Sequence, residues 1–218
     1  MLAINMLNNG SCSIRSLTNL NIIVGRNGSG KSRFLRTLAG LKNNSDYFIS
    51  YISPERVGSF LLDAGIEQTR QRDKNWESNN RLKNQADSFK KTSASKLREL
   101  AMQFAVRVEN DPSLRSQLTK TFVTEKLDKI NSLLNNIQLE RYGAQEFKFI
   151  TNNGDEVHPD SISSGESEAV SLGTEILHFF EQCSTEKINV LFLDEPDVHL
   201  HPDLQARLAR FIIREIEG

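Results

Sequence analysis

The sequence predicts an α/β domain with an N-terminal β-hairpin, a glycine-rich loop between a strand and a helix, and an inserted helical hairpin. Short apolar runs with strand character alternate with helically spaced apolar residues in 1–53 and 145–218. The glycine-rich loop separates one such run from a helix. Residues 55–141 differ, because polar helix formers dominate there and no glycine occurs between Gly65 and Gly143. Alternating strands and helices are typical of an α/β fold.

Composition excludes several classes of protein. The chain has 218 residues, 25% of them charged and 38% hydrophobic, with a formal net charge of -1, as in an ordinary globular domain. No apolar run approaches the ~20 residues that span a bilayer, so no membrane partner is expected. Cys12 and Cys183 have no metal or redox spacing, and the N-terminus lacks the pattern of a signal peptide. A cytoplasmic location is therefore expected.

A β-hairpin is expected at the N-terminus. Leu2, Ile4 and Met6 alternate with smaller or polar residues, as on a half-buried strand, and residues 12–17 can pair with them. Asn8-Asn9-Gly10 between the two segments is a turn signal, because Asn-Gly supplies positive φ angles.

A strand, a helix and a second strand should come next. Residues 20–24 form a short apolar run, expected as a buried strand, that stops at Gly25. Tyr47 to Ile52 has strand character and precedes Pro54. The helix between them is predicted from the spacing of Phe34, Leu35, Leu38 and Leu41.

The segment 55–141 is predicted to be two helices inserted into the domain. Asn110-Asp111-Pro112 should end the first helix, and Asp111 or Ser113 can cap the second. The first helix is marked by Leu82, Ala86, Phe89, Leu97, Ala101, Phe104 and Val108. The second is marked by Leu114, Leu118, Val123, Leu127, Ile130, Leu134 and Ile137.

The C-terminal part resumes the α/β pattern. Phe147, Phe149 and Thr151 indicate a strand, and a helix is expected after the polar loop at 163–165. Ile188 to Leu193 is a continuous apolar run, typical of a strand buried on both faces, and Pro202 begins a final helix.

The strongest motif is the glycine-rich loop at 25–32, which matches G-x-x-x-x-G-K-S/T. Glycines let successive backbone N–H groups converge on phosphate oxygens, and the helix after the loop adds its partial positive charge. Lys31 can reach the β and γ phosphates, and the Ser32 hydroxyl can ligate Mg²⁺. The expected nucleotide-binding residues are Gly25, Arg26, Asn27, Gly28, Ser29, Gly30, Lys31, Ser32 and Arg33.

A second motif is the acidic end of the strand at 188–193. A hydrophobic strand ending in an acid is how phosphate-loop enzymes present a carboxylate to Mg²⁺. Asp194 would hold the metal, while Glu195 would polarise the attacking water, with Lys31 as the other catalytic residue. A buried strand running into an acidic turn is the alternative interpretation of this motif alone.

With Ser163-Ser164-Gly165-Glu166 between them, these two motifs resemble the three sequence marks of an ABC-type P-loop ATPase. The resemblance implies ATP and Mg²⁺ as cofactors. It also implies that Ser164, Gly165 and Glu166 contact the nucleotide of an opposing subunit, giving a homodimer that sandwiches ATP. The signature spelling is a variant, and the alternative is a serine helix cap completed by Glu166.

The run from Asp194 to Pro202 resembles the "DEPE-x-x-LHP" form of the RecF, Rad50 and OLD branches, which ATPase subunits of several anti-phage systems share. The resemblance covers about 1–53 and 145–218 but not the insert. The sequence departs from a transport cassette because no glutamine ends the strand at 47–53, where Glu55 or Arg56 could face the nucleotide instead. It departs from the wider family because the switch histidine of that family would lie beyond Gly218. We therefore expect 1–218 to be an ATPase domain from the N-terminal part of a longer protein.

Two further features have alternative interpretations. Residues 67–107 carry ten Lys or Arg and five acids, a local net charge of +5, which could bind nucleic acid or an acidic partner or be a solvated helix face. His199 and His201 could ligate a transition metal, although the resemblance accounts for them as a loop that reaches across the dimer.

These observations favour an ATP-hydrolysing ABC-type ATPase that dimerises around ATP and controls an effector or a nucleic-acid-processing partner, in anti-phage defence or DNA repair. One alternative is a non-catalytic, nucleotide-gated assembly module. Another is the nucleotide-binding cassette of a transporter, which the missing glutamine and the Leu-His-Pro loop disfavour.

Overall fold

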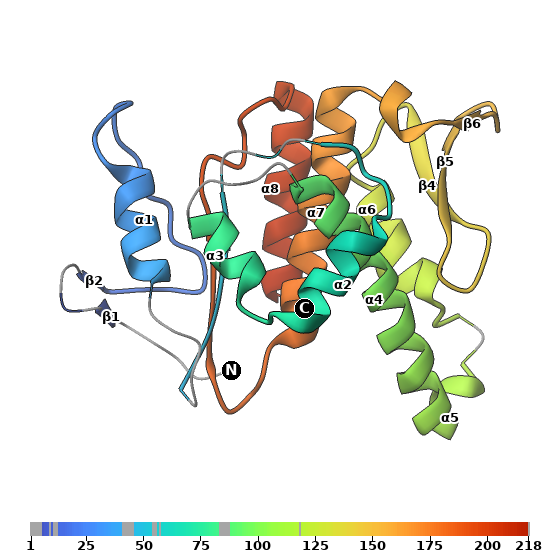
Figure 1. Ribbon diagram of the computed structural model, residues 1–218, viewed down its shortest axis with the longest axis horizontal. Helices are drawn as coiled ribbons and strands as arrows, with labels where there is room; N and C mark the ends of the chain where they lie inside the picture. The colour runs from blue at the N-terminus through green and yellow to red at the C-terminus, as the bar shows by residue number, and fades with distance from the viewer. Residues whose placement is uncertain are drawn as a thin grey trace.

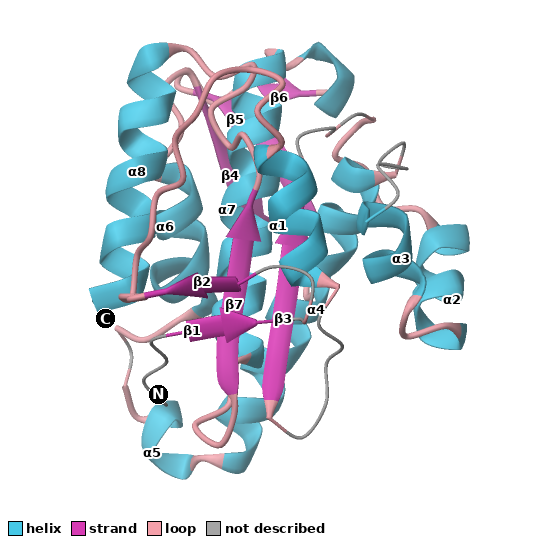
Figure 2. Ribbon diagram, turned by 90° about the vertical axis from the view of Figure 1, so that its left-hand side faces the viewer, coloured by secondary structure: helices cyan, strands magenta, loops and turns pink. Residues whose placement is uncertain are grey.

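Two parallel strands lie at the centre of the computed structural model, with one helix on one side and a group of helices on the other (Figures 1 and 2). The structure describes residues 6–8, 10, 13–40, 46–53, 56, 58–82, 88–117 and 119–217. Strand β3 (Tyr47–Ile52) pairs with β7 (Ile188–Leu193) in a register that runs from Tyr47 opposite Ile188 to Ile52 opposite Leu193. The strands predicted at 47–52 and 188–193 are therefore confirmed.

One face of this pair is covered by α1 (Lys31–Ala39) and by a small antiparallel ladder of β1 (Met6–Asn8) and β2 (Ser13–Arg15). Side chains alternate across a strand, so Ile49 and Tyr51 of β3 point to this side. They pack with Leu35 and Leu38 of α1 and with Leu7 of β1. The rest of the predicted hairpin, residues 1–5, 9, 11 and 12, lies outside the described residues.

The opposite face is covered by α7 (Ser164–Gln182), which packs against α4 (Phe89–Asn110) and α8 (Pro202–Glu217). Phe48 of β3 stacks on Phe179 of α7 with ring centroids 5.4 Å apart. A Cβ at Gly173 would lie 2.8 Å from a methyl group of Leu133, so α7 packs closely against Leu133 at this glycine. Most of α7 is buried, which makes it the central helix of the larger core.

The insert is not the helical hairpin that the sequence predicts. It contains α2 (Ala64–Arg72), α3 (Trp76–Leu82), α4, α5 (Pro112–Arg115), a π-helical turn η1 (Val123–Leu127) and α6 (Asp128–Asn131). Asp111 does cap α5, as expected, by accepting a hydrogen bond from the Ser113 N–H. The predicted second helix is therefore wrong as a single element, because the described residues 116, 117 and 119–121 are not helical and separate α5 from η1.

Ile137, assigned to that helix from the sequence, instead begins strand β4 (Ile137–Arg141). This strand pairs with β5 (Phe147–Thr151), which pairs with β6 (Glu156–Val157). A short helical turn, η2 (Pro159–Ser161), then leads to α7. Burial from Ile137 to Leu139 has a two-residue period, as expected on a strand. The Asn131 side chain donates a hydrogen bond to the Leu139 carbonyl at 3.1 Å and accepts one from the Leu139 N–H at 2.8 Å.

The apolar run at 20–24, expected as a buried strand, is an exposed connection in the structure. Ile22 is 79% exposed and Val24 is 87% exposed. Figure 2 shows the connection between β2 and the start of α1 running along the length of the sheet. Within the described part of the chain no strand forms a ladder with this segment, and an extended segment is a strand only where a neighbour pairs its backbone groups.

A buried group of charged side chains joins α3, α4 and α7. The Glu175 carboxylate lies 2.8 Å from the Arg81 guanidinium and 2.9 Å from the Lys96 ammonium group, and Glu77 pairs with the same two cations. Burial alone would raise the pKa of Glu175, but the charges of Arg81 and Lys96 outweigh it and hold the pKa below its ordinary value. This arrangement ties the insert to the central helix.

Glu175→Gln should lower the free energy of unfolding at pH 7 by about 3 kcal/mol, because Arg81 and Lys96 then lose the more deeply buried of their two counter-charges. The folded-state pKa lies below the unfolded value of about 4.3, so the contribution of Glu175 is complete above that pH and is lost as the pH falls further. Urea unfolding of both proteins at pH 7 and pH 3 measures this. We expect the difference to shrink at pH 3, and an equal difference at both pH values would contradict the assignment.

Candidate functional site

The loop at 25–32 has part of the geometry that its motif predicts: α1 follows it directly, whereas the strand expected before it is not found in the described structure. Gly28 and Gly30 have φ angles of 78° and 91°, which L side chains rarely adopt, and Gly30 is the residue before α1. The Ser29 N–H donates to the Arg26 carbonyl at 3.1 Å, which closes the loop. A Cβ at Gly25 would lie 2.8 Å from the Ser29 hydroxyl oxygen. The loop thus leads directly into the N-terminus of α1, a position suited to phosphate.

Lys31 folds back over this loop. Its Nζ donates to the carbonyl oxygens of Gly25 at 2.9 Å and of Arg26 at 3.2 Å. An ammonium group held in this way lies within the loop, where it can exchange carbonyl partners for phosphate oxygens. The expected contact residues Arg26, Asn27 and Arg33 are exposed around it.

Ser32 joins the loop to the acidic end of β7. The Ser32 hydroxyl donates to Oδ1 of Asp194 at 3.1 Å, although the two residues are 162 positions apart in the sequence. Asp194 is only 2% exposed. A hydroxyl and a carboxylate oxygen side by side are the donor set that Mg²⁺ prefers, so the residues predicted to hold the metal fit it.

Tyr51 holds the other oxygen of the same carboxylate, and sequence reasoning missed it. Its hydroxyl donates to Oδ2 of Asp194 at 2.6 Å. Burial and this hydrogen bond raise the pKa of Tyr51 well above its ordinary value, so the phenol remains a donor. The signal was its position, one residue from the carboxyl end of a strand parallel to β7, where side chains of neighbouring strands meet.

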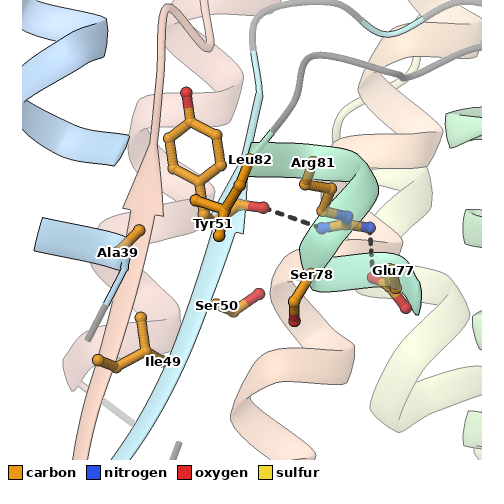
Figure 3. A pocket seen from close by; sticks show the side chains of 8 residues that line it. All are labelled: Ala39, Ile49, Ser50, Tyr51, Glu77, Ser78, Arg81 and Leu82. Atoms are coloured by element: carbon orange, nitrogen blue, oxygen red, sulfur yellow. Dashed lines mark hydrogen bonds and ion pairs between the residues drawn. The ribbon is translucent and has the colours of Figure 1, made fainter. Parts of the chain in front are cut away.

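The small cleft beside Tyr51 is lined by β3, α3 and the end of α1 (Figure 3). The Tyr51 carbonyl oxygen accepts a hydrogen bond from Arg81 at 3.3 Å, and Arg81 also pairs with Glu77. The Tyr51 side chain points away from Arg81, toward Asp194. The insert therefore supports the backbone of the strand that positions Asp194.

Glu195, the next residue after Asp194, has a φ angle of 47°, which is uncommon for a residue with a side chain. It is half-buried, and its carbonyl accepts a hydrogen bond from the Val198 N–H at 3.2 Å. The sequence position of Arg56 allowed it to face the nucleotide, but its side chain does not face the open side of the site. It is fully buried and directed at the backbone of Asp194 and Glu195, while Glu55 lies outside the described residues.

The loop at 163–166 forms a helix cap. The Ser163 hydroxyl accepts from the Glu166 N–H at 3.2 Å and donates to one Glu166 carboxylate oxygen at 2.8 Å, while the other oxygen accepts from the Asn136 N–H at 3.0 Å. Glu166 is therefore buried in the cap, and Ser164 is exposed beside it. Figure 1 shows the starts of α1 and α7 at the same end of the molecule but well apart. Lys31, Ser32, Asp194 and Glu195 come together, whereas Ser164 and Gly165 do not join them.

The two histidines of the H-x-H pair are both exposed, and His199 has a positive φ angle of 69°. Nδ1 of His201 accepts a hydrogen bond from the Asp203 N–H at 3.5 Å. No group of three or more metal-ligating side chains occurs among the residues that the structure describes. The described residues therefore place no third metal-ligating side chain beside this pair.

The positive charge at 67–107 is largely neutralised within the described structure. Six of the ten basic side chains form ion pairs, and Lys90 is buried. Only Arg72 and Lys74, at the end of α2, are described as exposed without an ion pair, and Lys83 lies outside the described residues. The pairs are Arg70 with Glu77 and Glu99, Arg81 and Lys96 with Glu77 and Glu175, Lys91 with Asp63, Arg98 with Glu67, and Arg107 with Glu125 and Glu181. This pattern favours a structural role over a nucleic-acid surface.

Residues 59–217 match the protein family described as "AAA ATPase domain", which is well over half of the chain. The chain belongs to this family. The match includes the acidic end of β7 and the start of α7 but begins after the loop at 25–32, so the loop is assigned by its own motif and by its contact with Asp194. No curated protein and no solved structure matched the chain significantly. In the described part of this AAA ATPase domain protein, none of the helices has the length and apolar character needed to cross a bilayer.

Lys31→Ala should weaken ATP binding by about 10- to 100-fold, since charge-assisted hydrogen bonds contribute about 1.5–3 kcal/mol each. Titration of a fluorescent ATP analogue measures the affinity. Lys91→Ala is the matched control, because Lys91 is a half-exposed lysine paired with Asp63 on the insert. Equal affinity of Lys31→Ala and wild type would contradict the phosphate-loop assignment.

Proposed function

We propose that this chain binds ATP at Gly25–Ser32 and hydrolyses it to ADP and phosphate. The observation that carries the proposal is the hydrogen bond between Ser32 and Asp194, which joins the phosphate loop to the acidic end of β7. Backbone N–H groups of the loop would bind the β and γ phosphates, and Lys31 would exchange its two carbonyl partners for phosphate oxygens.

The chain's own residues would divide the chemistry between them. Ser32 and Asp194 would hold Mg²⁺, which neutralises phosphate charge when bound. Tyr51 keeps the Asp194 carboxylate oriented by occupying one of its oxygens. Glu195 would accept a proton from the attacking water and orient that water toward the γ-phosphate.

We further propose that two copies pair around ATP. The resemblance to ABC-type ATPases assigns the γ-phosphate of one copy to Ser164 and Gly165 of the other. Two features support this: the exposure of Ser164, and the separation between the start of α7 and the copy's own phosphate loop. Glu166 would contribute through the cap it forms with Ser163 rather than by direct contact.

The pairing would control an effector or a nucleic-acid-processing partner, as in the RecF, Rad50 and OLD branches and in anti-phage systems. The run from Asp194 to Pro202 supports this branch. Ion pairing of the basic insert favours an effector protein over direct contact between residues 67–107 and nucleic acid. Loss of DNA and RNA retention in a Lys91→Glu variant would restore the nucleic-acid hypothesis.

Glu195→Gln should accumulate as an ATP-dependent dimer. The amide keeps the size of the carboxylate but cannot accept the proton, so ATP would hold the two copies together without being cleaved. Light scattering with and without Mg-ATP measures the mass. At ATP concentrations that just saturate Glu195→Gln, the Lys31→Ala, Glu195→Gln double variant should remain monomeric, because its affinity for ATP is about 10- to 100-fold lower.

Ser164→Arg in the Glu195→Gln background is the sharper control, because it fills the γ-phosphate contact while leaving ATP binding to the monomer intact. If Glu195→Gln binds ATP but stays monomeric, ATP-dependent pairing is wrong. If wild type pairs around ATP without turnover, the chain is a nucleotide-gated assembly module rather than an ATPase.

A further inference from the structure

The Arg56 side chain is buried and reaches four acceptors near the site. Its Nη1 donates to the Ser53 carbonyl at 2.8 Å and to the Asp194 carbonyl at 3.3 Å, and its Nη2 donates to the Glu195 carbonyl at 3.0 Å. Its Nε pairs with the Glu168 carboxylate. The exposed fractions of the Arg56 and Glu168 side chains are 0% and 2%, so water does not compete for these contacts.

The Glu195 backbone needs such support. Its φ angle of 47° lies in the left-handed region, which costs about 1–3 kcal/mol for a residue with a side chain and persists only where surrounding contacts hold it. The Glu195 carbonyl accepts from Arg56 on one side and from the Val198 N–H on the other. The direction of the Glu195 side chain therefore depends on a guanidinium group that cannot itself touch the nucleotide from its buried position.

Glu168 connects this support to α7. It lies one turn after Ser164 on the same helix, and it supplies the only carboxylate paired with Arg56 among the described residues. A displacement of the first turn of α7 would therefore act on the guanidinium that holds Glu195. A lysine could not replace Arg56, because a single ammonium group cannot reach a carboxylate and three carbonyls in the directions that the planar fork allows.

We propose that Arg56 is a positioning residue that holds Glu195 in its left-handed conformation and, through Glu168, makes this placement depend on α7. The proposal rests on the proposed function, in which Glu195 orients the attacking water. The competing interpretation is that Arg56 and Glu168 are a buried ion pair that stabilises the fold and nothing more. The chain offers a matched control, because Glu175 lies two turns further along α7, is equally buried, and pairs with Arg81 and Lys96 rather than with Arg56.

The experiment compares wild type with Arg56→Lys, Glu168→Gln and Glu175→Gln in the whole chain. Hydrogen exchange of the 194–198 backbone should accelerate in Arg56→Lys and Glu168→Gln and not in Glu175→Gln. With ATP, kcat should fall at least tenfold in Arg56→Lys and Glu168→Gln, since small misplacements of a catalytic group have effects of this size, while the Kd for ATP stays within twofold. Urea unfolding checks that all three variants remain folded.

A second readout separates positioning from stability. In a Glu195→Gln background, Arg56→Lys should lower the residual rate no further, because the group it positions is already absent. Equal losses of kcat in Glu168→Gln and Glu175→Gln, or unchanged exchange at 194–198 in Arg56→Lys, would overturn the proposal. If wild type hydrolyses no ATP, the proposed function fails, and hydrogen exchange alone then decides whether Arg56 holds Glu195.

Discussion

The hydrogen bond from Ser32 to Asp194 joins two ends of the chain, and the surrounding structure fixes both of its partners. Ser32 is placed by the start of α1, where the left-handed turn at Gly30 begins the helix. Asp194 is placed by the parallel pairing of β7 with β3 and by the Tyr51 hydroxyl. Removal of either side chain would break the contact between the phosphate loop and the acidic end of β7. The glycine motif would then be linked to no carboxylate and could not be told from a simple helix cap.

Buried charges organise the rest of the molecule around this contact. Arg56 connects the backbone of Asp194 and Glu195 to Glu168 on α7, and Glu175 connects α7 to the insert. Buried ion pairs contribute little net stability compared with apolar packing, but breaking one is costly and their geometry is specific. The Arg56 contacts therefore join α7 to the acidic end of β7, while the Glu175 contacts join α7 to the insert. Six of the ten basic side chains at 67–107 contribute to this pairing of charges.

The sequence predicted those elements whose local pattern agrees with their tertiary environment. The strands at 47–52 and 188–193, the helix after Ser163, the helix beginning at Pro202 and the Asp111 cap are found where they were expected. Ile137 was misassigned because its spacing from Ile130 and Leu134 fits a helix, whereas the two-residue alternation from Ile137 onward places it on a strand. The run at 20–24 has strand composition, but strand formation depends on a paired neighbour, which local sequence does not encode.

The sequence predicted the motif residues of the candidate site but not the residues that hold them in place. Lys31, Ser32, Asp194 and Glu195 belong to motifs with fixed spacing, so they can be selected from the sequence as candidate site residues. Tyr51, Arg56 and Glu168 act through contacts between segments separated by 112 to 143 residues, and no local pattern distinguishes them from other polar residues. Glu166 shows the reverse case, because its spacing from Ser163 is that of a capping box and the structure contains that cap.

The most direct test of the account is a double-mutant cycle on ATP affinity, measured by isothermal titration in Mg²⁺ with wild type, Ser32→Ala, Asp194→Asn and the double variant. If the two side chains hold one metal, the double variant should bind ATP no more weakly than the weaker single variant, with a coupling of at least about 1 kcal/mol. All four proteins should bind ATP alike when EDTA removes the metal. Additive losses in Mg²⁺, or equal losses with and without it, would contradict the claim that Ser32 and Asp194 form a single site.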